Sequence, residues 1–271
     1  MQLKDLIRQT AAQFRKAGIT SPVLDVQILA GFVLNKDKSW LIANSDYRLN
    51  SAQLKLINDL AKKRLSRVPI AYILKTKEFY GLDFFTNDSV LIPRNETETL
   101  VEWSIKLTPK NAKVLDIGTG SGAIAIAIKK NRADLAITAT DISVKAINLA
   151  RKNADNILGK DKIQFTTSDL FNKINSKFDL IIANLPYVPN NMKNKISPEA
   201  KTEPKVALFG GESNGLDIYS RFFAETPKYL SKGGYLLIEC DNFQKTEIAD
   251  LAKENKLKLI RKDYLHLAFK H

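Results

Sequence analysis

Four consecutive residues, Asn184-Leu185-Pro186-Tyr187, carry groups suited to holding a planar –NH2 group. They follow the apolar run Phe178–Ala183, which predicts a buried strand, so the Asn side chain stands at a strand end. Its carbonyl oxygen can accept one N–H and the next backbone carbonyl the other, while the Tyr ring packs against the flat face. Such a grip suits an amide or an exocyclic amine that receives a methyl group. Because Pro and Asn also favour turns, a strand-terminating turn without a ligand is the alternative.

A glycine-rich loop lies upstream, between the predicted strand Val114–Ile117 and a helix that begins at Ala123. The loop residues are Gly118, Thr119, Gly120, Ser121 and Gly122. Glycines let the backbone approach a ligand, and the helix N-terminus presents free N–H groups. The spacing also satisfies the dinucleotide fingerprint, with the acidic Asp141 about 20 residues further on, where a carboxylate can accept ribose hydroxyls. Since a nicotinamide cofactor and S-adenosylmethionine both contain such a ribose, the loop alone is ambiguous.

Two further features favour S-adenosylmethionine. Asp116, inside the strand before the glycines, suits a cofactor with a cationic amino-acid moiety better than one with a pyrophosphate. In a doubly wound sheet the strand that ends at Asn184 lies beside the loop, and a dehydrogenase has no need of an amine grip there. We therefore expect S-adenosyl-L-methionine as the cofactor and no bound metal.

The composition is typical of a globular protein: 44% of the 271 residues are apolar and 26% are charged. No stretch has the roughly 18 uncharged apolar residues of a membrane helix, and the charged, amphipathic start does not resemble a secretory signal. Cys240 is the only cysteine, so an internal disulfide is impossible. These features predict a cytoplasmic protein.

The formal net charge is +13, from 42 basic and 29 acidic residues. Such a charge favours acidic partners or nucleic acid. The basic residues are mostly Lys and are spread over the whole chain, which favours a solvated surface over a binding stripe. We expect that nucleic acid is not required.

The first 72 residues predict a small helical domain. Leu3, Leu6, Ile7 and Phe14 have helical spacing, Gly18 suits a C-terminal cap, and Ser21-Pro22 suits a helix start. The segment Val23–Leu34 is apolar nearly all round, which predicts a central, buried helix. A short helix should carry Trp40 and Leu41, and a longer one should cover Ser51–Leu65 with Leu54, Leu56, Ile57, Leu60 and Leu65 inward.

Residues 73–94 predict a hairpin connector with Gly81 near its turn, and residues 95–271 alternate strands with helices. The predicted strands are Val114–Ile117, Ala136–Thr140, Ile163–Thr166, Leu180–Ala183, Tyr235–Glu239 and one or two within Leu257–Phe269. The predicted helices are Ala123–Lys130, Ser143–Asn153, Gly215–Leu230 and Lys245–Asn255. This alternation indicates an α/β domain with a parallel sheet covered on both faces and ligands at the carboxyl ends of its strands.

Several segments together resemble the peptide chain release factor glutamine N5-methyltransferases, the PrmC/HemK family, over nearly the whole chain. They are Arg67–Ile73, Glu78–Gly81, Leu91–Glu98, Asp116–Gly122, Ser168–Phe171, Asn184–Tyr187, Glu203-Pro204, Ala207-Leu208, Gly210-Gly211 and Asn214–Leu216. The resemblance implies a class I S-adenosylmethionine-dependent methyltransferase, with a doubly wound seven-stranded sheet and an N-terminal helical domain that docks the substrate. It implies methylation of the Gln amide in the Gly-Gly-Gln loop of bacterial release factors.

By motif position, Asp116, Gly118–Gly122, Asp141, Asp169 and Leu170 would contact the cofactor, and Asn184 also reaches it. Asn184, Leu185, Pro186 and Tyr187 would hold the Gln amide. The chain departs from the family pattern at Leu185, where Pro is usual, at Asn95, and at Cys240-Asp241. Leu185 keeps the carbonyl that should accept an amide N–H, but it lacks the fixed φ of Pro.

No His, Cys or carboxylate is obviously placed as a base, so we expect the site to act by positioning. His266 and His271 are interpreted as structural or surface residues. The long, Lys-rich loop Val188–Glu212 is predicted to dock substrate, and Arg94 and Glu96 to brace the site.

Three other functions stay open at this stage. A ribosomal-protein glutamine methyltransferase uses the same chemistry. An adenine N6-methyltransferase could use the same grip, although no aromatic-rich basic stripe is present. A release-factor-binding protein that has lost turnover through Leu185 is the third.

Overall fold

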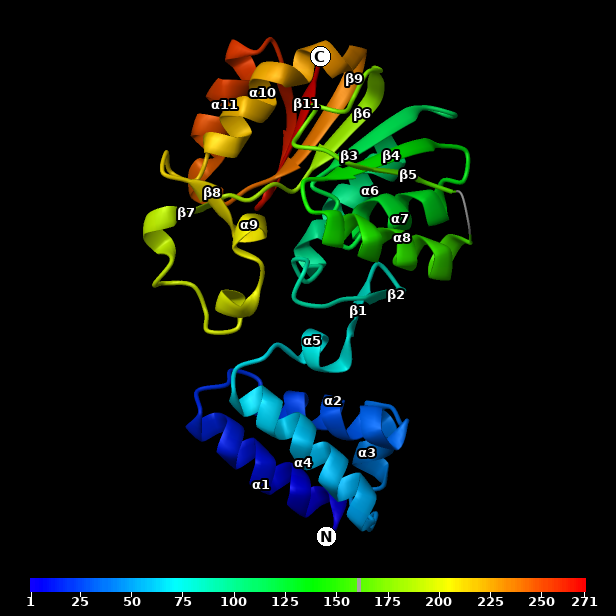
Figure 1. Cartoon of the computed structure of the whole chain (residues 1–271), viewed down its shortest axis with the longest axis vertical. Coiled ribbons are helices and arrows are strands. Elements are labelled where there is room, and N and C mark those ends of the chain that lie inside the picture. The colour runs from blue at the N-terminus through cyan, green and yellow to red at the C-terminus, as the bar shows by residue number, and fades with distance from the viewer. Residues whose placement is uncertain (160–161) are drawn as a thin grey trace. The chain divides into compact units, whose positions relative to one another are not determined.

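The structure is a computed structural model that describes residues 1–159 and 162–271. It divides into two compact units (Figure 1). The helical unit comprises Met1–Lys75 together with Ser197–Thr202, and the sheet unit comprises Thr76–Ile196 and Glu203–His271. In the described parts of the chain, no helix has the length and apolar character needed to cross a membrane.

The helical unit contains the four predicted helices and one short addition. They are α1 (Leu3–Lys16), α2 (Pro22–Leu34), α3 (Lys38–Ala43), α4 (Ser51–Leu65) and α5 (Ile70–Leu74). Gly18 follows the end of α1 with a φ of +72°, the left-handed conformation that suits a residue after a helix. Helix α4 begins with a capping box, in which Asn50 accepts from the Gln53 N–H and the Gln53 side chain accepts from the Asn50 N–H.

The prediction that α2 is buried all round is wrong. Val26, Leu29 and Ala30 lie in the core, whereas Leu24, Ile28 and Phe32 are 45%, 37% and 55% exposed. The exposed residues are spaced four apart, so they form one stripe on the helix surface. Leu56 of α4, also predicted inward, is exposed as well. Overall apolarity does not reveal which face of a helix lacks a neighbour, and this unit has too few helices to cover every face.

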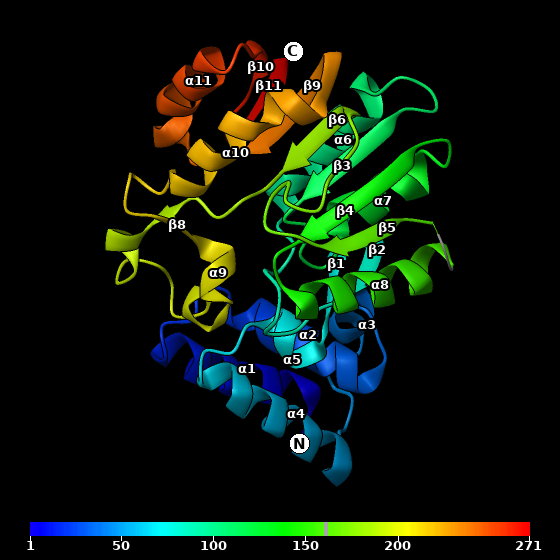
Figure 2. The same cartoon turned by 45° about the horizontal axis from the view of Figure 1, so that its top comes forward.

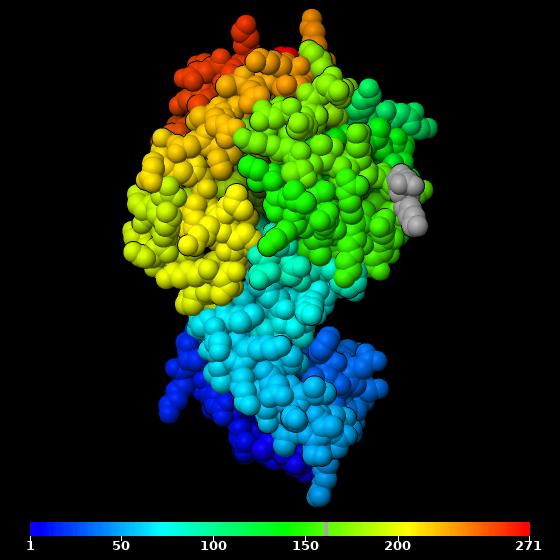
Figure 3. Space-filling model, viewed as in Figure 1, coloured from blue at the N-terminus to red at the C-terminus, as the bar shows by residue number. Residues whose placement is uncertain are grey.

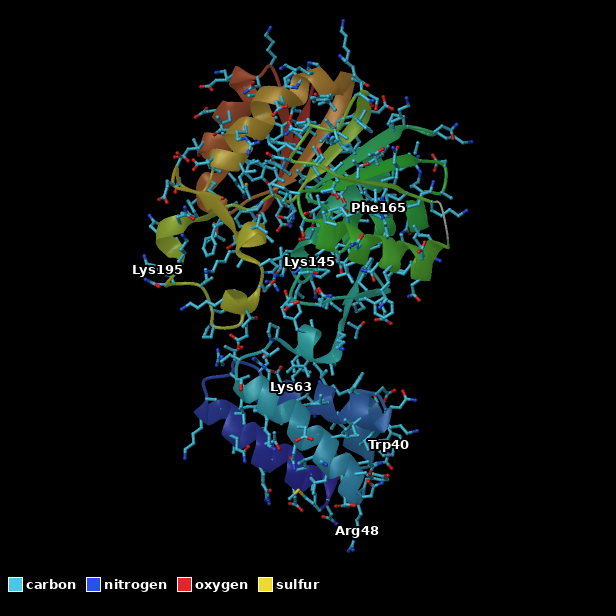
Figure 4. The ribbon with its side chains drawn as sticks, viewed as in Figure 1. Trp40, Arg48, Lys63, Lys145, Phe165 and Lys195 are labelled. Carbon is cyan, nitrogen blue, oxygen red and sulfur yellow. The ribbon has the colours of Figure 1, made fainter. Side chains whose placement is uncertain are left out.

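A buried charge cluster that the sequence did not predict joins Ser197–Thr202 to the helical unit. Arg64 is 6% exposed, and its Nε donates to Asp25 Oδ2 at 2.7 Å. Its Nη1 donates to Glu199 Oε1 at 2.8 Å, and Arg67 Nη2 donates to Glu199 Oε2 at 2.9 Å. Because a buried guanidinium needs such partners, Glu199 is held firmly against this unit. Lys195, labelled in Figure 4, lies just before this segment on the same long loop.

The predicted hairpin is present as β1 (Thr76–Phe79) and β2 (Leu82–Phe85). The two residues of its turn, Tyr80 and Gly81, both have positive φ, of 54° and 71°, as a type I′ turn requires. Phe79 and Phe84 are fully buried in the core of the sheet unit. The hairpin is therefore part of that unit, which begins at Thr76.

The seven-stranded sheet has the order β10-β11-β9-β6-β3-β4-β5. The strands are β3 (Lys113–Ile117), β4 (Ala136–Asp141), β5 (Gln164–Thr167), β6 (Phe178–Ala183), β9 (Leu230–Glu239), β10 (Lys258–Lys262) and β11 (His266–Lys270). The sequence predicted a parallel sheet, but β11 runs antiparallel to both β9 and β10. The sheet is mixed because the short segment between β10 and β11 allows only an antiparallel return.

Helices cover both faces of the sheet, as can be followed in Figure 2. One face packs on α6 (Glu98–Leu107), α7 (Ala123–Asn131) and α8 (Val144–Leu158), and the other on α10 (Asp217–Tyr229) and α11 (Lys245–Glu254). The long loop after β6 carries the two-stranded pair of β7 (Val188–Pro189) and β8 (Phe209–Gly211), with the short α9 (Lys205–Leu208) between them.

Candidate active site

The register of the parallel strands places four polar or glycine positions in one row. Ile117 of β3 pairs with Thr140 of β4 and with Ala183 of β6, and Ala183 pairs with Ile238 of β9. The next residue of each strand or loop is therefore Asp141, Gly118, Asn184 and Glu239, in that order across the sheet. The first three were predicted site residues, and the fold brings them to the same carboxyl edge.

A pocket opens along this row. Its lining includes ten predicted residues: Gly118, Thr119, Gly120, Ser121, Asp141, Asp169, Leu170, Asn184, Leu185 and Pro186. Further walls come from Ile142 and Val206, and Figure 3 shows the surface hollowed between the green and yellow parts of the sheet unit. Asp116, Gly122 and Tyr187 do not line it, so these three predicted residues can act only from behind its walls or beside them.

The glycine loop is shaped by close packing on one side and open space on the other. Gly122 has a φ of +82°, and a Cβ there would lie 2.8 Å from Ile126 Cδ1 and 3.1 Å from Ala150 Cβ. Gly120 has a φ of +55°, and its Cβ would meet nothing within 4 Å. Gly122 thus lets α7 and α8 pack together, whereas Gly120 leaves the backbone accessible to a ligand.

Four of the five backbone N–H groups of this loop, those of Gly118, Thr119, Gly120 and Gly122, are already used within the protein. Those of Gly118 and Thr119 donate to the Thr140 carbonyl at 2.8 and 2.9 Å, and that of Gly120 donates to Asp141 Oδ2 at 2.9 Å. A dinucleotide needs such N–H groups for its pyrophosphate. Their absence from the pocket disfavours a dinucleotide at this loop.

Asp116 lies buried beneath the loop. Thr119 Oγ1 donates to its Oδ2 at 2.6 Å, while Oδ1 has no partner among residues 1–159 and 162–271. Burial raises the pKa of Asp116 to about 7, against the lowering effects of the Thr119 hydroxyl and of the Ala125 backbone N–H. A buried carboxylate with a free oxygen attracts a cation and repels a phosphate, so it fits a ligand with an ammonium group.

Asp141 is fixed by two backbone groups. Gly120 N donates to its Oδ2, and Ser143 N donates to its Oδ1 at 2.8 Å. Burial raises the pKa of this carboxyl, and the two N–H groups oppose that rise. Each oxygen keeps one further lone pair, so Asp141 can still accept from two neighbouring hydroxyls, as the sequence predicted for a ribose.

The predicted residues Asp169 and Leu170 form another part of the pocket wall. Leu170 is buried with a φ of +44°, and Ser168 Oγ donates to its carbonyl at 3.0 Å. The Asp169 carboxylate accepts from Arg221 Nη2 at 2.7 Å. Asp169 therefore orients Arg221, which also lines the pocket, and Leu170 supplies an apolar surface.

Asn184 and Leu185, the two predicted acceptors of an amide, both line the pocket. Asn184 Nδ2 donates to Thr97 Oγ1 at 3.3 Å. The side-chain carbonyl oxygen of Asn184 does not take part in this bond. The Leu185 N–H donates to the Tyr219 hydroxyl at 3.3 Å, and that hydroxyl donates to the Glu239 carbonyl at 2.5 Å. A Pro at position 185 has no N–H and could not make this bond. A hydrogen bond from its N–H therefore restrains the backbone at Leu185, where the ring of a Pro would restrain it in the usual family pattern.

Tyr187 lies close to Glu239, with 3.5 Å between its hydroxyl and Oε1. Burial raises the pKa of Tyr187, and the charge of Glu239 adds to that effect. The phenol therefore stays protonated at neutral pH and cannot serve as a base.

The sequence missed several polar residues around the grip. Thr97, Glu239 and His266 are all buried, and Thr97 also lines the pocket. Only the position of Glu239 at a strand end signalled such a role. Glu203 is buried too, where it accepts from the Ile92 N–H at 3.0 Å and from Arg94 Nη2 at 2.5 Å. Arg94 is therefore paired with Glu203, whereas Glu96, predicted to brace the site together with Arg94, is exposed.

Two families match parts of the chain. Residues 5–74 match the PrmC N-terminal domain, and residues 96–199 match the methyltransferase small domain. A release factor glutamine methyltransferase from Buchnera aphidicola subsp. Baizongia pistaciae is 36% identical, over 92% of this chain and 89% of that protein. One from Clostridium acetobutylicum is 34% identical, over 98% of this chain and 96% of that protein.

Solved structures share the fold. A methyltransferase from Pyrococcus furiosus superposes with a TM-score of 0.54 at 17% identity, over 70% of this chain and 89% of that one. The ribosomal protein L11 methylase from Lactobacillus delbrueckii subsp. bulgaricus gives a TM-score of 0.50 at 25% identity, over 65% and 79%.

The mixed seven-stranded sheet, its glycine loop and the pocket at its carboxyl edge define a class I S-adenosylmethionine-dependent methyltransferase. Within that class the relatives are similar along nearly their whole length. The chain belongs to the family of release factor glutamine methyltransferases.

The raised pKa of Asp116 predicts a pH-dependent stability. Its pKa rises from 3.8 to about 7 on folding, so between those values the folded protein holds a proton that the unfolded chain has lost. The stabilisation from this proton is lost as the pH rises through 7. The free energy of unfolding of the wild type, minus that of Asp116→Asn, should fall by about 1 kcal/mol between about pH 6 and about pH 8.5.

Urea denaturation at the two pH values measures this difference. A Trp40→Phe background leaves Trp103, the other of the two tryptophans, as the fluorescence reporter of the sheet unit. Groups that titrate equally in both proteins cancel. A difference between the two proteins that is the same at both pH values would mean that Asp116 titrates elsewhere.

Proposed function

We propose that this protein transfers a methyl group from S-adenosyl-L-methionine to the side-chain amide nitrogen, N5, of the Gln in the Gly-Gly-Gln loop of peptide chain release factors. The observation that carries the proposal is the pair of acceptors at the end of β6, the Asn184 side-chain carbonyl and the Leu185 backbone carbonyl. They border the pocket that contains the glycine loop. The names of the two relatives described above, both release factor glutamine methyltransferases, support the choice of substrate.

The pocket residues fit the cofactor. Asp116, with its unpartnered oxygen, would attract the cationic amino-acid end, and Asp141 would accept from the ribose hydroxyls. Leu170 would contact the adenine side, next to Asp169. The cofactor supplies an electrophilic methyl group on a sulfonium. The N–H groups of Gly118, Thr119 and Gly120 are already occupied, which favours this ligand over a dinucleotide.

The chain's own residues would act on the amide by positioning it. An amide nitrogen is a weak nucleophile because its lone pair is delocalised into the carbonyl. When Asn184 and Leu185 each accept one N–H, the nitrogen is fixed with its lone pair directed at the methyl group, and orientation of this kind is worth several kcal/mol. The same carbonyl dipoles stabilise the positive charge that develops on nitrogen. Since Tyr187 stays protonated, the proton leaves after transfer, from a strongly acidic methylated amide.

Methylation of purified release factor tests the function. We expect one methyl group, located by mass spectrometry on the loop Gln, and none on a factor whose Gln is replaced by Ala. Incorporation into ribosomal protein or into DNA adenine, with none in release factor, would favour the other two enzymes. Cofactor binding without transfer to any of them would indicate a binding protein that has lost turnover.

Asn184→Ala should keep the fold and cofactor affinity but lose at least about a hundredfold in methyl transfer, because one of the two acceptors is removed. Single-turnover rates with release factor measure the loss, and calorimetry measures the dissociation constant of the cofactor. Near-normal turnover in this variant would falsify the amide grip.

Asp141→Ala should weaken S-adenosylmethionine binding by about 1.5–3 kcal/mol, because two ribose hydroxyls lose their acceptor. Titration calorimetry gives the affinity, and circular dichroism checks that the loop held by Asp141 still folds. The cofactor assignment would be overturned by an unchanged dissociation constant, or by tight binding of NAD to the wild type.

The helical unit is proposed as the module that docks the release factor. It contains no cluster of residues suited to catalysis, and residues 1–75 have thirteen Lys and Arg against five Asp and no Glu, a net charge of +8. The exposed stripe of Leu24, Ile28 and Phe32 adds apolar surface of the kind found at protein interfaces. The positive charge of this unit and its exposed apolar stripe are complementary to an acidic protein surface that also exposes apolar side chains.

The double variant Leu24→Ser/Phe32→Ser should raise KM for whole release factor at least about tenfold, with little change in kcat, because hot-spot residues at interfaces contribute 1–2 kcal/mol or more. The rate on a short Gly-Gly-Gln peptide should be unchanged, since a peptide is too small to engage the stripe as well as the pocket. Leu56→Ser, on the exposed side of α4, is the matched control. Equal KM values for the double variant and the wild type would rule out docking through α2.

A further inference from the structure

A buried chain of polar side chains stands behind the amide grip. Ala183 pairs with Ile238, which brings Glu239 beside Asn184, and His266 of β11 pairs directly with Glu239. Thr97, at the start of α6, completes the contact between them. Glu239, His266 and Thr97 are 2%, 3% and 5% exposed, so each must satisfy its hydrogen bonds within the protein.

Asp263 is the last residue of this series of hydrogen-bonded side chains. Its Oδ1 accepts from the backbone N–H groups of Leu265 and His266, and lies 2.8 Å from His266 Nδ1. Although burial opposes it, the bonds from His266 hold the pKa of Asp263 below its usual range. An ionised Asp263 can only accept, so Nδ1 of His266 carries a hydrogen.

The second ring nitrogen of His266, Nε2, lies 3.3 Å from Glu239 Oε2. Burial alone would lower the pKa of His266, but the hydrogen bonds and charges of Glu239 and Asp263 outweigh it and raise that pKa. Because Nδ1 already carries a hydrogen, a hydrogen bond between Nε2 and Glu239 Oε2 needs a second hydrogen on the ring, and the raised pKa of His266 favours it. The same Oε2 accepts from Thr97 Oγ1 at 2.7 Å.

The direction of these bonds determines how Asn184 points. A threonine hydroxyl has one hydrogen, and Thr97 gives it to Glu239. Toward Asn184, Thr97 Oγ1 can then only accept, so it must face the –NH2 group of the Asn184 amide at 3.3 Å. The Asn184 carbonyl oxygen is thereby left for the pocket. If Thr97 donated to Asn184 instead, the amide would turn over and present –NH2 to the substrate.

We propose that Glu239, with its charge supported by His266 and Asp263, is a positioning residue that sets the direction of this hydrogen-bond chain and so keeps Asn184 as an acceptor. The inference rests on the proposed function, because it assumes that the carbonyl of Asn184 receives a substrate N–H. It gives a role to two buried groups outside the pocket lining, Glu239 and His266, and to Thr97, which lines the pocket beside Asn184.

A variant that reverses the donor and acceptor roles along this series of hydrogen bonds tests the proposal. In Glu239→Gln the charge that supports the second proton on His266 is gone, so Nε2 becomes an acceptor. The new –NH2 group can then donate to both Nε2 and Thr97. Thr97 would donate to Asn184 and turn its amide over, so methyl transfer should fall at least about thirtyfold, with cofactor affinity unchanged.

Asn184→Asp should also lose activity in the wild-type background, because Thr97 offers a lone pair, not a hydrogen, to the new carboxylate. In the double variant Glu239→Gln/Asn184→Asp the reversed chain is satisfied again: Thr97 donates to one oxygen of the carboxylate at position 184, and the second oxygen accepts in the pocket. The double variant should therefore be at least about fivefold faster than Glu239→Gln alone.

Thr97 provides matched controls. Thr97→Ser keeps the hydroxyl and should lose no more than about threefold, whereas Thr97→Val, of the same shape, should lose at least about tenfold in kcat with cofactor affinity unchanged. A merely structural role for Glu239 predicts that the double variant is slower than either single one. That result, with active wild type, would overturn the inference. If the wild type itself transfers no methyl group to release factor, the proposed function has failed instead.

Discussion

The register of the parallel strands is the constraint on which the site depends. Because Ile117 aligns with Thr140 and Ala183, and Ala183 with Ile238, the residues one step beyond them form a single row across four strands. A shift of β6 by one residue would turn Asn184 to the other face and separate it from both the glycine loop and Glu239. The apolar cores on the two faces fix this register, so packing and site geometry have the same origin.

Polar groups in the row are organised mainly by one another. Gly120 and Ser143 hold Asp141, Thr140 takes up two N–H groups of the glycine loop, and Glu239 lies at the centre of the bonds around the grip. Low dielectric inside the protein makes an unmatched polar group costly, so these partners restrict each side chain to one orientation. Preorganisation of this kind is what the proposed positioning of the amide requires. Leu185 illustrates it, since its N–H bond to Tyr219 replaces the rigidity of a Pro.

Much of the fold could be predicted from the sequence, because the spacing of apolar residues and the residues that begin and end helices and turns act locally. Helix α4 covers Ser51–Leu65 as its apolar spacing and start signals predicted, and the Tyr80-Gly81 turn follows from the hairpin pattern. The exposure of α2 could not be predicted, because it depends on which neighbours a helix has. The antiparallel direction of β11 depends likewise on how the chain returns to the sheet.

Pocket-lining residues could be predicted where a motif is continuous in sequence, as in Gly118–Ser121 and Asn184–Pro186. The site could not be predicted where partners come from distant segments. Glu239 and His266 meet through strand pairing, and Thr97 reaches them from the start of α6. His266 was interpreted as structural or surface because nothing nearby in sequence marks it. The Arg64–Glu199 ion pair joins residues 135 positions apart, beyond the reach of any local pattern.

The central claim is that Asn184 and Leu185 hold a glutamine amide at the methyl donor. A crystal structure of the protein with S-adenosylhomocysteine and a Gly-Gly-Gln peptide tests it most directly. We expect the Gln side-chain nitrogen to lie within about 3 Å of both Asn184 Oδ1 and the Leu185 carbonyl oxygen. A Gln amide bound elsewhere, or an Asn184 that presents its –NH2 group to the peptide, would contradict it.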